Sequence, residues 1–152
     1  MLEWRTTTIE DCEQLSQTIN HTDAQELYDA TGLNPYQGLV MCVKLCPDCE
    51  TAINEHNEVL AIRGVQKLNT HGMVWAILTK QAYTKAGFKQ AMQETKQWVV
   101  NKTEQYKKLM NFVSEENQSA VRWLKYIGFS ITKKIDHYGY SKKPFLQFER
   151  VL

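Results

Sequence analysis

The chain has 152 residues, of which 43% are hydrophobic and 23% charged, as in an ordinary folded domain. This length suffices for one domain with a sizeable core and is short for two, so we expect a single domain over residues 1–152. The apolar runs are too short for a membrane span, and the N-terminus lacks the pattern of a signal peptide. We therefore expect a cytoplasmic protein rather than a membrane or secreted one.

The net charge of +1 conceals an asymmetry along the chain. Residues 1–60 carry two basic and eleven acidic side chains, whereas residues 61–152 carry sixteen basic and six acidic ones. The basic half either faces phosphates, of a nucleotide cofactor or a nucleic acid, or packs on the acidic half so that the fields cancel. No helix-turn-helix, zinc-finger or ribonucleoprotein motif is present and the sequence pI is about 7.7, so a nucleic-acid partner is not expected.

Hydrophobic periodicity and turn residues divide the chain into strands and helices. Residues 73–79 are a continuous apolar run of strand length, typical of a strand buried on both faces. Residues 35–45 fit a short helix, although residues 39–43 also fit a strand. In chain order we expect a strand (2–7), three helices (9–19, 23–31 and 35–45), a hairpin (51–54 and 59–68), a buried strand (73–79), a long helix (82–104), a strand (109–113), a helix (from about 117) and a closing hairpin (130–138 and 145–151).

Polar pairs in the first third predict where the early helices start. Thr8 with Asp11 precedes the first helix, and Thr22 with Gln25 precedes the second, each in the spacing of a capping box. Asn34, followed by proline, is a suitable cap for the third helix.

Residues 106–129 predict a strand, a turn and a helix that ends at a glycine. Either Ser114 or Asn117 is a suitable N-cap. Gly128 stands where a helix ends in a left-handed residue. One apolar face of the helix is formed by Ala120, Trp123, Leu124 and Ile127, at positions i, i+3, i+4 and i+7.

This segment resembles the last signature block of the GCN5-related N-acetyltransferase (GNAT) superfamily, and the order of elements resembles that fold over nearly the whole chain. The block reads Asn, two residues, Ala, the rest of a helix, then Gly-Phe, which Asn117, Ala120, Gly128 and Phe129 match. The resemblance implies an α/β (α+β) GNAT fold, with a mixed, mostly antiparallel sheet of six or seven strands and about four helices. It also implies an N-acetyltransferase that uses acetyl-CoA and acetylates an amine of a small molecule or a protein.

A narrower resemblance covers about the last fifty residues. They are similar to the GNAT-like internal virion protein A of short-tailed phages and its relatives. This implies a phage protein in the host cytoplasm or the virion, with a virion or host protein as partner. The matching residues are Tyr106, Leu109, Asn111, Asn117, Leu124, Lys125, Ile127, Gly128, Tyr138 and Phe145.

In the GNAT superfamily a turn reading Arg/Gln-x-x-Gly-x-Gly/Ala opens the central helix and holds the cofactor's pyrophosphate with backbone N–H groups. Residues 84–89 keep only Gly87 of this pattern, because Thr84 and Lys89 replace its first and last positions. Lys89 lies on one helix stripe with Lys85 and Lys96, which either contacts phosphates or is a solvated flank. The cofactor contacts that the resemblance implies are Ile77, Thr79, Lys85, Gly87, Phe88, Lys89 and Asn117.

The catalytic groups are less clear from the sequence. The superfamily often places a proton-donating tyrosine four residues before the helix-ending glycine, and that position is Leu124 here. Tyr126 lies about 200° away around the helix and is either a replacement or a structural tyrosine. His71, before the buried strand, is either a general base or a solvated loop residue. Asn117 either lies near the acetyl group or only caps a helix. A catalytically silent GNAT-like protein, acting in a virion or on a host protein, is therefore the alternative function.

Three cysteines, Cys42, Cys46 and Cys49, have the spacing of an iron–sulfur motif and include a pair in a zinc-like spacing. The chain is too short for the barrel that carries that iron–sulfur chemistry. Cys12 and His56 are the nearest candidates for a fourth zinc ligand, and neither has partner spacing. We expect buried structural thiols and no metal, with zinc as the open alternative.

Overall fold

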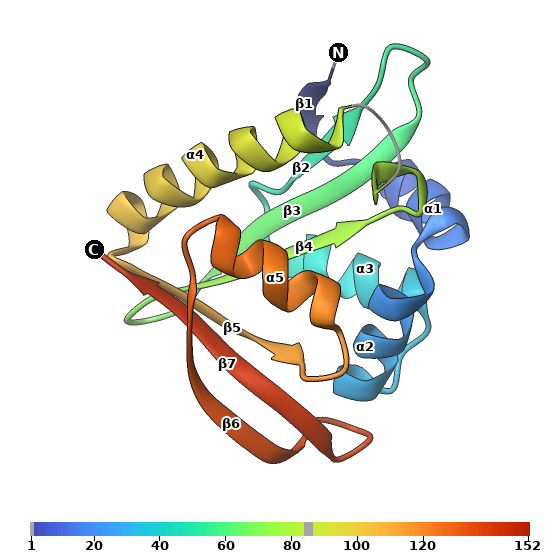
Figure 1. The fold of residues 1–152 in the computed structure, drawn as a ribbon. Helices are drawn as coiled ribbons and strands as arrows, with labels where there is room; N and C mark the ends of the chain where they lie inside the picture. Colours follow the sequence, from blue (N-terminus) through green and yellow to red (C-terminus); the bar gives the residue numbers. More distant parts are fainter. Residues whose placement is uncertain (1, 84–86) are drawn as a thin grey trace.

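A seven-stranded sheet in the order β1-β2-β3-β4-β5-β7-β6 runs through the molecule, as Figure 1 shows. The computed structural model describes residues 2–83 and 87–152. The described elements are β1 (Glu3–Thr6), α1 (Ile9–Thr18), α2 (His21–Thr31), α3 (Pro35–Leu45), β2 (Glu50–Ile53), β3 (Val59–Lys67), β4 (Gly72–Leu78), a 3₁₀ turn (Gln81–Tyr83), α4 (Phe88–Tyr106), β5 (Lys108–Ser114), α5 (Gln118–Tyr126), β6 (Ser130–Tyr138) and β7 (Lys143–Val151).

The strands β4 and β5 form the one parallel pair among the described strands, and they stay paired for only two residues. Gly72 lies beside Leu109 and Met73 beside Met110, after which the two strands splay apart. The Asn111 side chain donates to the carbonyl oxygen of Val74 at 2.8 Å. This side-chain bond takes the acceptor that would continue the ladder, so the sheet opens at this point.

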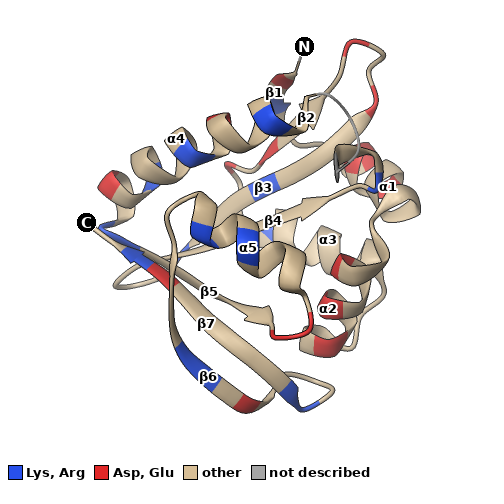
Figure 2. Ribbon diagram, in the orientation of Figure 1, with Lys and Arg blue, Asp and Glu red and all other residues tan. Residues whose placement is uncertain are grey.

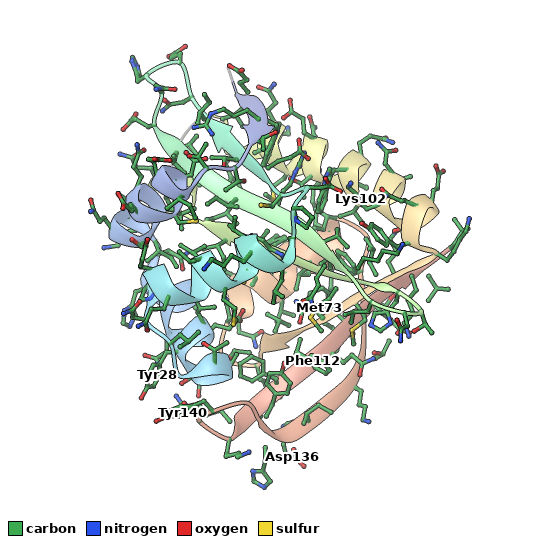
Figure 3. All side chains as sticks on the ribbon, turned by 180° about the vertical axis from the view of Figure 1, so that it is seen from behind. Tyr28, Met73, Lys102, Phe112, Asp136 and Tyr140 are labelled. Atoms are coloured by element: carbon green, nitrogen blue, oxygen red, sulfur yellow. The ribbon has the colours of Figure 1, made fainter. Side chains whose placement is uncertain are left out.

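Helices cover both faces of the sheet. In the view of Figure 1, α4 and α5 lie in front, whereas α1, α2 and α3 pack behind, as the reverse view in Figure 3 confirms. The buried front core includes Leu60, Val65, Val74, Leu78, Met92, Val99, Leu109, Val113, Val121, Leu124 and Phe148. The buried rear core includes Cys12, Leu15, Ile19, Leu39, Ile53, Val59, Ile62 and Ile77.

The second helix starts earlier than predicted. Its N-cap is Asn20, not Thr22, so the predicted Thr22–Gln25 capping pair is wrong. The Oδ1 atom of Asn20 accepts from the backbone N–H of Asp23 at 2.8 Å, and its Nδ2 donates to the Asp23 carboxylate at 2.8 Å. These two reciprocal bonds with Asp23 stabilise the helix start at Asn20. The hydroxyl of Thr22, two residues later, does not provide them.

The central helix starts later than predicted, at Phe88 rather than at residue 82. Gln81–Tyr83 is a single 3₁₀ turn, because the backbone N–H of Ala82 bonds to both the carbonyl and the hydroxyl oxygen of Thr79. The turn therefore stays tied to the end of β4, and a separate helix follows. Residues 39–43, which also fitted a strand, lie within helix α3.

The prediction for residues 106–129 is confirmed. Asn117 rather than Ser114 is the N-cap of α5, with its Oδ1 accepting from the backbone N–H of Ala120 at 3.3 Å. Gly128 has a positive φ of 112° after the last turn. The fold is also confirmed as a mixed, mostly antiparallel sheet, with seven strands and five α-helices among the described residues.

The charge asymmetry of the sequence becomes a separation in space. In Figure 2 acidic residues gather on α1 and α2, and basic residues lie on α5 and along α4 and β6. Within the described part of the chain, no helix combines the length and the apolar character needed to cross a membrane.

Candidate functional site

A cavity of about 240 Å³ lies where β4 and β5 splay, and it passes through the sheet. Its walls come from both sides of the sheet. Front residues in the lining include Thr95, Trp98, Val99, Trp123 and Leu124, and rear residues include Leu27, Met41, Met73, Phe112 and Phe145. The opening of the sheet therefore joins the layer under α4 and α5 to the layer under α2 and α3.

The backbone of β4 presents polar groups to this opening. The N–H of Thr79 bonds to Leu60 on β3, and in an antiparallel ladder alternate residues face the same neighbour. Ile77 therefore also turns its backbone toward β3, whereas Ala76 and Leu78 turn theirs toward β5. The backbone N–H of Leu78 donates to Asp23 on α2, and its carbonyl oxygen accepts from Asn20, the residue before that helix. The backbone N–H and C=O groups of Ala76 are therefore the ones that face the gap.

Two carboxylates from helix α2 line the cavity. Asp23 accepts from Asn20 and from the backbone N–H of Leu78, at 2.8 and 3.3 Å. Glu26 accepts through Oε1 from the backbone N–H of Ser114 at 2.9 Å. Asn117 donates to both carboxylates, at 3.1 Å to Asp23 and 3.2 Å to Glu26. A spacing of three residues places both carboxylates on one face of the helix, where they join α2 to β4, β5 and α5.

Burial raises the pKa of both carboxyl groups. For Glu26 burial is the largest cause, and the charge of Asp23 adds to it, so that its pKa is raised to about 7 despite the bonds from Ser114 and Asn117. For Asp23 burial also raises the pKa, against the bonds from Asn20, Leu78 and Asn117. A carboxylate that titrates near neutral pH is suited to take a proton from a substrate.

A second, open groove of about 510 Å³ lies between the start of α4 and helix α5. Lys89 and Arg122 supply two positive charges to it, and Tyr126 and Ser119 supply hydroxyl groups. Trp123 lines both this groove and the cavity through the sheet, so the two spaces adjoin. Paired cations beside a helix N-terminus suit a phosphorylated ligand.

Two buried donors in the cavity have no partner among the described residues. They are the indole N–H groups of Trp98 and Trp123, and both side chains line the cavity. A buried donor without an acceptor is costly, which favours a polar ligand group at this place. The residues therefore fit the acyl and amide groups of an acyl-CoA in the cavity and its phosphates in the groove.

The structure brings together several residues that the sequence singled out. Phe88, Lys89 and Tyr126 line the outer groove. Gly87 is the N-cap of α4, and a Cβ built there would meet, among the described residues, only Leu2 at 3.8 Å. The backbone at the start of α4 is therefore uncrowded.

The other predicted cofactor contacts lie in different places. Ile77 lines the cavity from the rear, but Thr79 is buried and accepts at its hydroxyl from Ala82. Asn117 is buried beside the carboxylate pair. Lys85 lies outside the described residues.

The two predicted catalytic candidates do not meet. Tyr126 is half-exposed on α5, and Lys96 lies over its ring at 5.2 Å. His71 precedes β4, at the end where β4 and β5 are still paired, so the length of β4 separates it from Asp23, roughly 20 Å at the usual rise per residue. Leu124 is buried, and it lines the cavity.

Sequence reasoning missed Asp23 and Glu26 as candidate catalytic groups. A signal was present, because the pair shares its helix face with Ala30, which lines the same cavity. That face combines acidic and apolar residues, which is unusual for a solvated helix.

The four cysteines are free thiols near one another behind the sheet. Cys12, Cys46 and Cys49 are buried and Cys42 is partly buried. Burial raises the pKa of Cys12 to about 11 and that of Cys42 to about 12, which keeps the thiols protonated. The indole N–H of Trp75 donates to the Cys46 sulfur at 2.9 Å. Residues 2–83 and 87–152 contain no group of three or more metal-ligating side chains suited to hold an ion.

A sequence profile described as "Bacteriophage T7, probable scaffold protein Gp13" matches residues 50–135, more than half of the chain. This chain belongs to that Gp13 family. The matched segment runs from β2 to β6 and so contains β4, β5 and the splay between them. No curated protein matches the chain in sequence.

Solved acetyltransferases share the fold across the whole chain. Ard1 from Thermoplasma volcanium has a TM-score of 0.75 and 15% identity, covering 99% of this chain and 97% of its own. The spermidine N-acetyltransferase of Vibrio cholerae, solved with CoA and spermine, has a TM-score of 0.73 and 10% identity, covering 99% and 95%. A phosphinothricin acetyltransferase from Sinorhizobium meliloti, solved with acetyl-CoA, has a TM-score of 0.67 and 10% identity, covering 99% and 88%. The Gp13-family chain therefore has the GNAT fold.

Proposed function

We propose that this protein is an acyl-CoA-dependent N-acetyltransferase, which moves an acetyl group from acetyl-CoA to an amine. The observation that carries the proposal is the cavity through the sheet, with the Asp23–Glu26 pair on its wall. A transfer between two substrates requires that both reach a common point, and a passage with walls on both faces of the sheet provides one.

The donor side of the proposed site is the front. Lys89 and Arg122 in the outer groove bind the phosphates, with Gly87 and Phe88 at the start of α4 beside them. The indole N–H groups and the backbone of Ala76 bind polar groups of the acyl arm. Asn117 acts indirectly in this scheme, because it caps α5 and orients the carboxylate pair.

Acetyl-CoA supplies an acetyl thioester: the amine nitrogen forms the new C–N bond, the C–S bond breaks, and CoA leaves as a thiolate that takes up a proton from water. Glu26 takes the proton that the nitrogen loses. Its Oε1 is held by Ser114 and Asn117, which leaves Oε2 without a partner among the described residues. Asp23 raises the proton affinity of Glu26 by its charge, so the base takes a proton at neutral pH.

Calorimetric titration of the full chain with acetyl-CoA and with CoA tests this proposal. We expect saturable binding that Arg122→Glu weakens roughly tenfold or more, because it replaces a phosphate-binding cation by a repelling charge. Lys89→Glu is expected to act in the same direction. Lys133→Glu, an exposed site on β6, is the matched control and should leave the affinity unchanged. The absence of both heat and a thermal shift at millimolar cofactor would remove the enzyme proposal.

The family match favours a second candidate function, a catalytically silent component of a phage particle. This candidate predicts that the chain is present in purified particles at a fixed copy number, whether or not acetyl-CoA binds. Quantitative mass spectrometry of particles measures that number, and absence of the chain from them would contradict it.

The similarity of the last fifty residues to internal virion protein A belongs to this second candidate. We propose on this basis that the protein is of phage origin, acting in the host cytoplasm or in the virion with a virion or host protein as partner.

A further inference from the structure

The rear half of the cavity is mainly apolar, apart from the carboxylate pair and the hydroxyl-bearing side chains of Thr31 and Tyr138. Asp23 and Glu26 are the acidic residues in its lining among the described residues. The rear walls are formed by Leu27, Ala30, Met41, Met73, Phe112 and Phe145. Figure 3 shows Met73 and Phe112 on this rear side of the sheet. A ligand that enters from the rear therefore meets mainly apolar side chains, and the carboxylate pair supplies the negative charge of the lining.

The aromatic wall is built from rings that face one another. The ring centroids of Phe112 and Tyr138 lie 4.7 Å apart, and those of Tyr138 and Phe145 lie 4.6 Å apart. Both pairs are close to parallel, with interplanar angles of 29° and 36°. The face that each ring turns toward its neighbour is not free to hold a cation. The wall offers apolar contact to a ligand.

Two further acidic residues, Asp29 and Glu116, are not in the cavity lining and share the cation of Lys143. Asp29, one helical turn after Glu26, is 1% exposed and lies 3.4 Å from the ammonium group of Lys143. The Gln25 side chain donates to the same carboxylate at 3.0 Å. Glu116, at the same place, also lies 3.9 Å from Lys143. Asp29 is thus ion-paired and outside the cavity lining, and Asp23 and Glu26 are the carboxylates that line the cavity among the described residues.

We propose that the acceptor is a primary amine at the end of an unbranched apolar stem that carries no second positive charge. This inference rests on the proposed function. A lysine side chain in a polypeptide and a small alkylamine share this chemistry. The ammonium group meets Asp23 and Glu26 at the inner end while the stem lies against Met41, Met73 and Phe112. A polyamine has to bury a second ammonium group against that apolar wall without a counter-ion, which disfavours it.

Calorimetry without acetyl-CoA tests the inference by binding alone. The probes are Nα-acetyl-lysine-N-methylamide, n-butylamine and spermidine, each titrated into the full chain at the same pH and salt. We expect at least one of the two monoamines to bind roughly tenfold or more tightly than spermidine. Tighter binding of the lysine derivative than of n-butylamine assigns a polypeptide source, and equal binding assigns a small amine. Spermidine that binds as tightly as both monoamines, or no amine bound at millimolar concentration, would overturn the inference.

A substitution in the wall sharpens the test. Met41→Glu places a third carboxylate in the lining, apart from the Asp23–Glu26 pair, at a residue that is 37% exposed. We expect spermidine affinity to rise roughly tenfold while monoamine affinity does not rise. Met41→Gln is the matched control, with nearly the same shape and no charge, and it should leave spermidine binding weak. An equal rise for all amines with Met41→Glu would contradict a single-charge acceptor.

These outcomes separate the inference from the proposed function. Monoamine binding without acetyl transfer, when acetyl-CoA binds, supports the acceptor class and removes the catalytic proposal. Acetyl transfer to spermidine in preference to the lysine derivative supports catalysis and overturns the acceptor class.

Discussion

At the scale of single residues, Glu26 decides whether the cavity is a reaction site. Its carboxyl group is held by Ser114 and Asn117 and is repelled by Asp23 and Asp29. Tyr138 also faces it, and burial together with the Glu26 charge raises the tyrosine pKa. Among the described residues, none of the groups that shift the pKa of Glu26 is a cation. These surroundings raise the pKa of Glu26 to about 7, so its carboxyl group stays mostly protonated below that pH.

The variant Glu26→Gln tests this role because it keeps the shape and removes the proton acceptor. For the unaltered chain we expect the transfer rate to rise with pH through about 7, as Glu26 loses its proton. Glu26→Gln should reduce the rate by roughly 10²–10⁴-fold and abolish that rise. A pH profile of kcat on both proteins measures this, with Glu116→Gln as an exposed control. Retention of the pH-dependent rise in Glu26→Gln would assign the base elsewhere.

The same substitution has a signature in stability. The folded-state pKa of Glu26 lies above its unfolded value of 4.5. The stability that its protonation contributes is therefore complete below pH 4.5 and is lost as the pH rises through about 7. Glu26→Gln lacks this loss, so its stability relative to the unaltered chain should improve by about 2–3 kcal/mol between pH 4.5 and pH 8. Urea unfolding at a series of pH values gives the comparison, and parallel pH curves would contradict it.

At the scale of elements, the splay of β4 from β5 is the feature that makes a site. The first two residues of the pair are joined by backbone contacts, and Gly72 permits the approach. A Cβ built at Gly72 would lie 2.5 Å from Val65, 3.0 Å from Leu109 and 3.1 Å from Tyr106. The paired end of β4 and β5 therefore has no room for a further methyl group at Gly72. At the open end, side-chain hydrogen bonds from Asn111 to Val74 and between Asp23 and Leu78 hold the strands.

The variant Gly72→Ala should therefore destabilise the fold by about 1–3 kcal/mol, because packed side chains around the strand have to move. Gly87→Ala is the matched control, since Leu2, at 3.8 Å, is the one described residue that its Cβ would meet and its φ is −77°. That control should be neutral or slightly stabilising. Chemical denaturation of the two variants measures the difference, and equal midpoints would mean that the β4–β5 contact yields without cost.

The order of the elements could be predicted from the sequence because its signals are local. Alternation, apolar runs and caps such as Asn117 act over a few residues. The splay could not be predicted in the same way. It depends on Asn111 bonding to Val74, 37 residues earlier, and on Asp23 bonding to Leu78, 55 residues later. Bonds between such distant residues leave no periodic trace in the sequence.

The candidate site likewise contains residues that could be singled out from the sequence and residues that could not. Lys89 and Phe88, which line the open groove, could be singled out because they belong to a recognisable turn pattern, even though only Gly87 of that pattern remains. Glu26 could not be assigned, because its raised pKa arises from burial and from the charge of Asp23, and because its hydrogen-bond partner Asn117 lies 91 residues away. A carboxylate becomes a base only through its surroundings, and those are a property of the fold.

At the scale of the whole molecule, the acidic and basic halves of the chain come to lie on different sides of one sheet. The acidic helices α1 and α2 stand behind it, and the basic α5 stands in front, as Figure 2 shows. An anionic donor and a cationic acceptor would each approach the face of opposite charge, and they would meet in the cavity between the faces.

Hydrogen bonds connect both ends of the chain to the region of helix α4, which leads to a prediction about folding. The indole N–H of Trp4, on β1, donates to Glu94 on α4 at 2.9 Å, across 90 residues. At the other end, the backbone N–H of Leu152 donates to the carbonyl oxygen of Lys107 at 2.9 Å. Each terminus is therefore tied to the central helix or to the residue that ends it.

We accordingly expect the 152 residues to unfold as one cooperative domain. Tryptophan fluorescence reports the environments of Trp4, Trp75, Trp98 and Trp123, which lie in β1, β4, α4 and α5, and far-ultraviolet circular dichroism reports the whole backbone. The two transitions in urea should coincide. Trp4→Phe removes the bond to Glu94 and should lower both midpoints together, by about 1 kcal/mol of stability. If β1 and β2 formed a separate unit, fluorescence would change before circular dichroism, and the substitution would shift only the earlier transition.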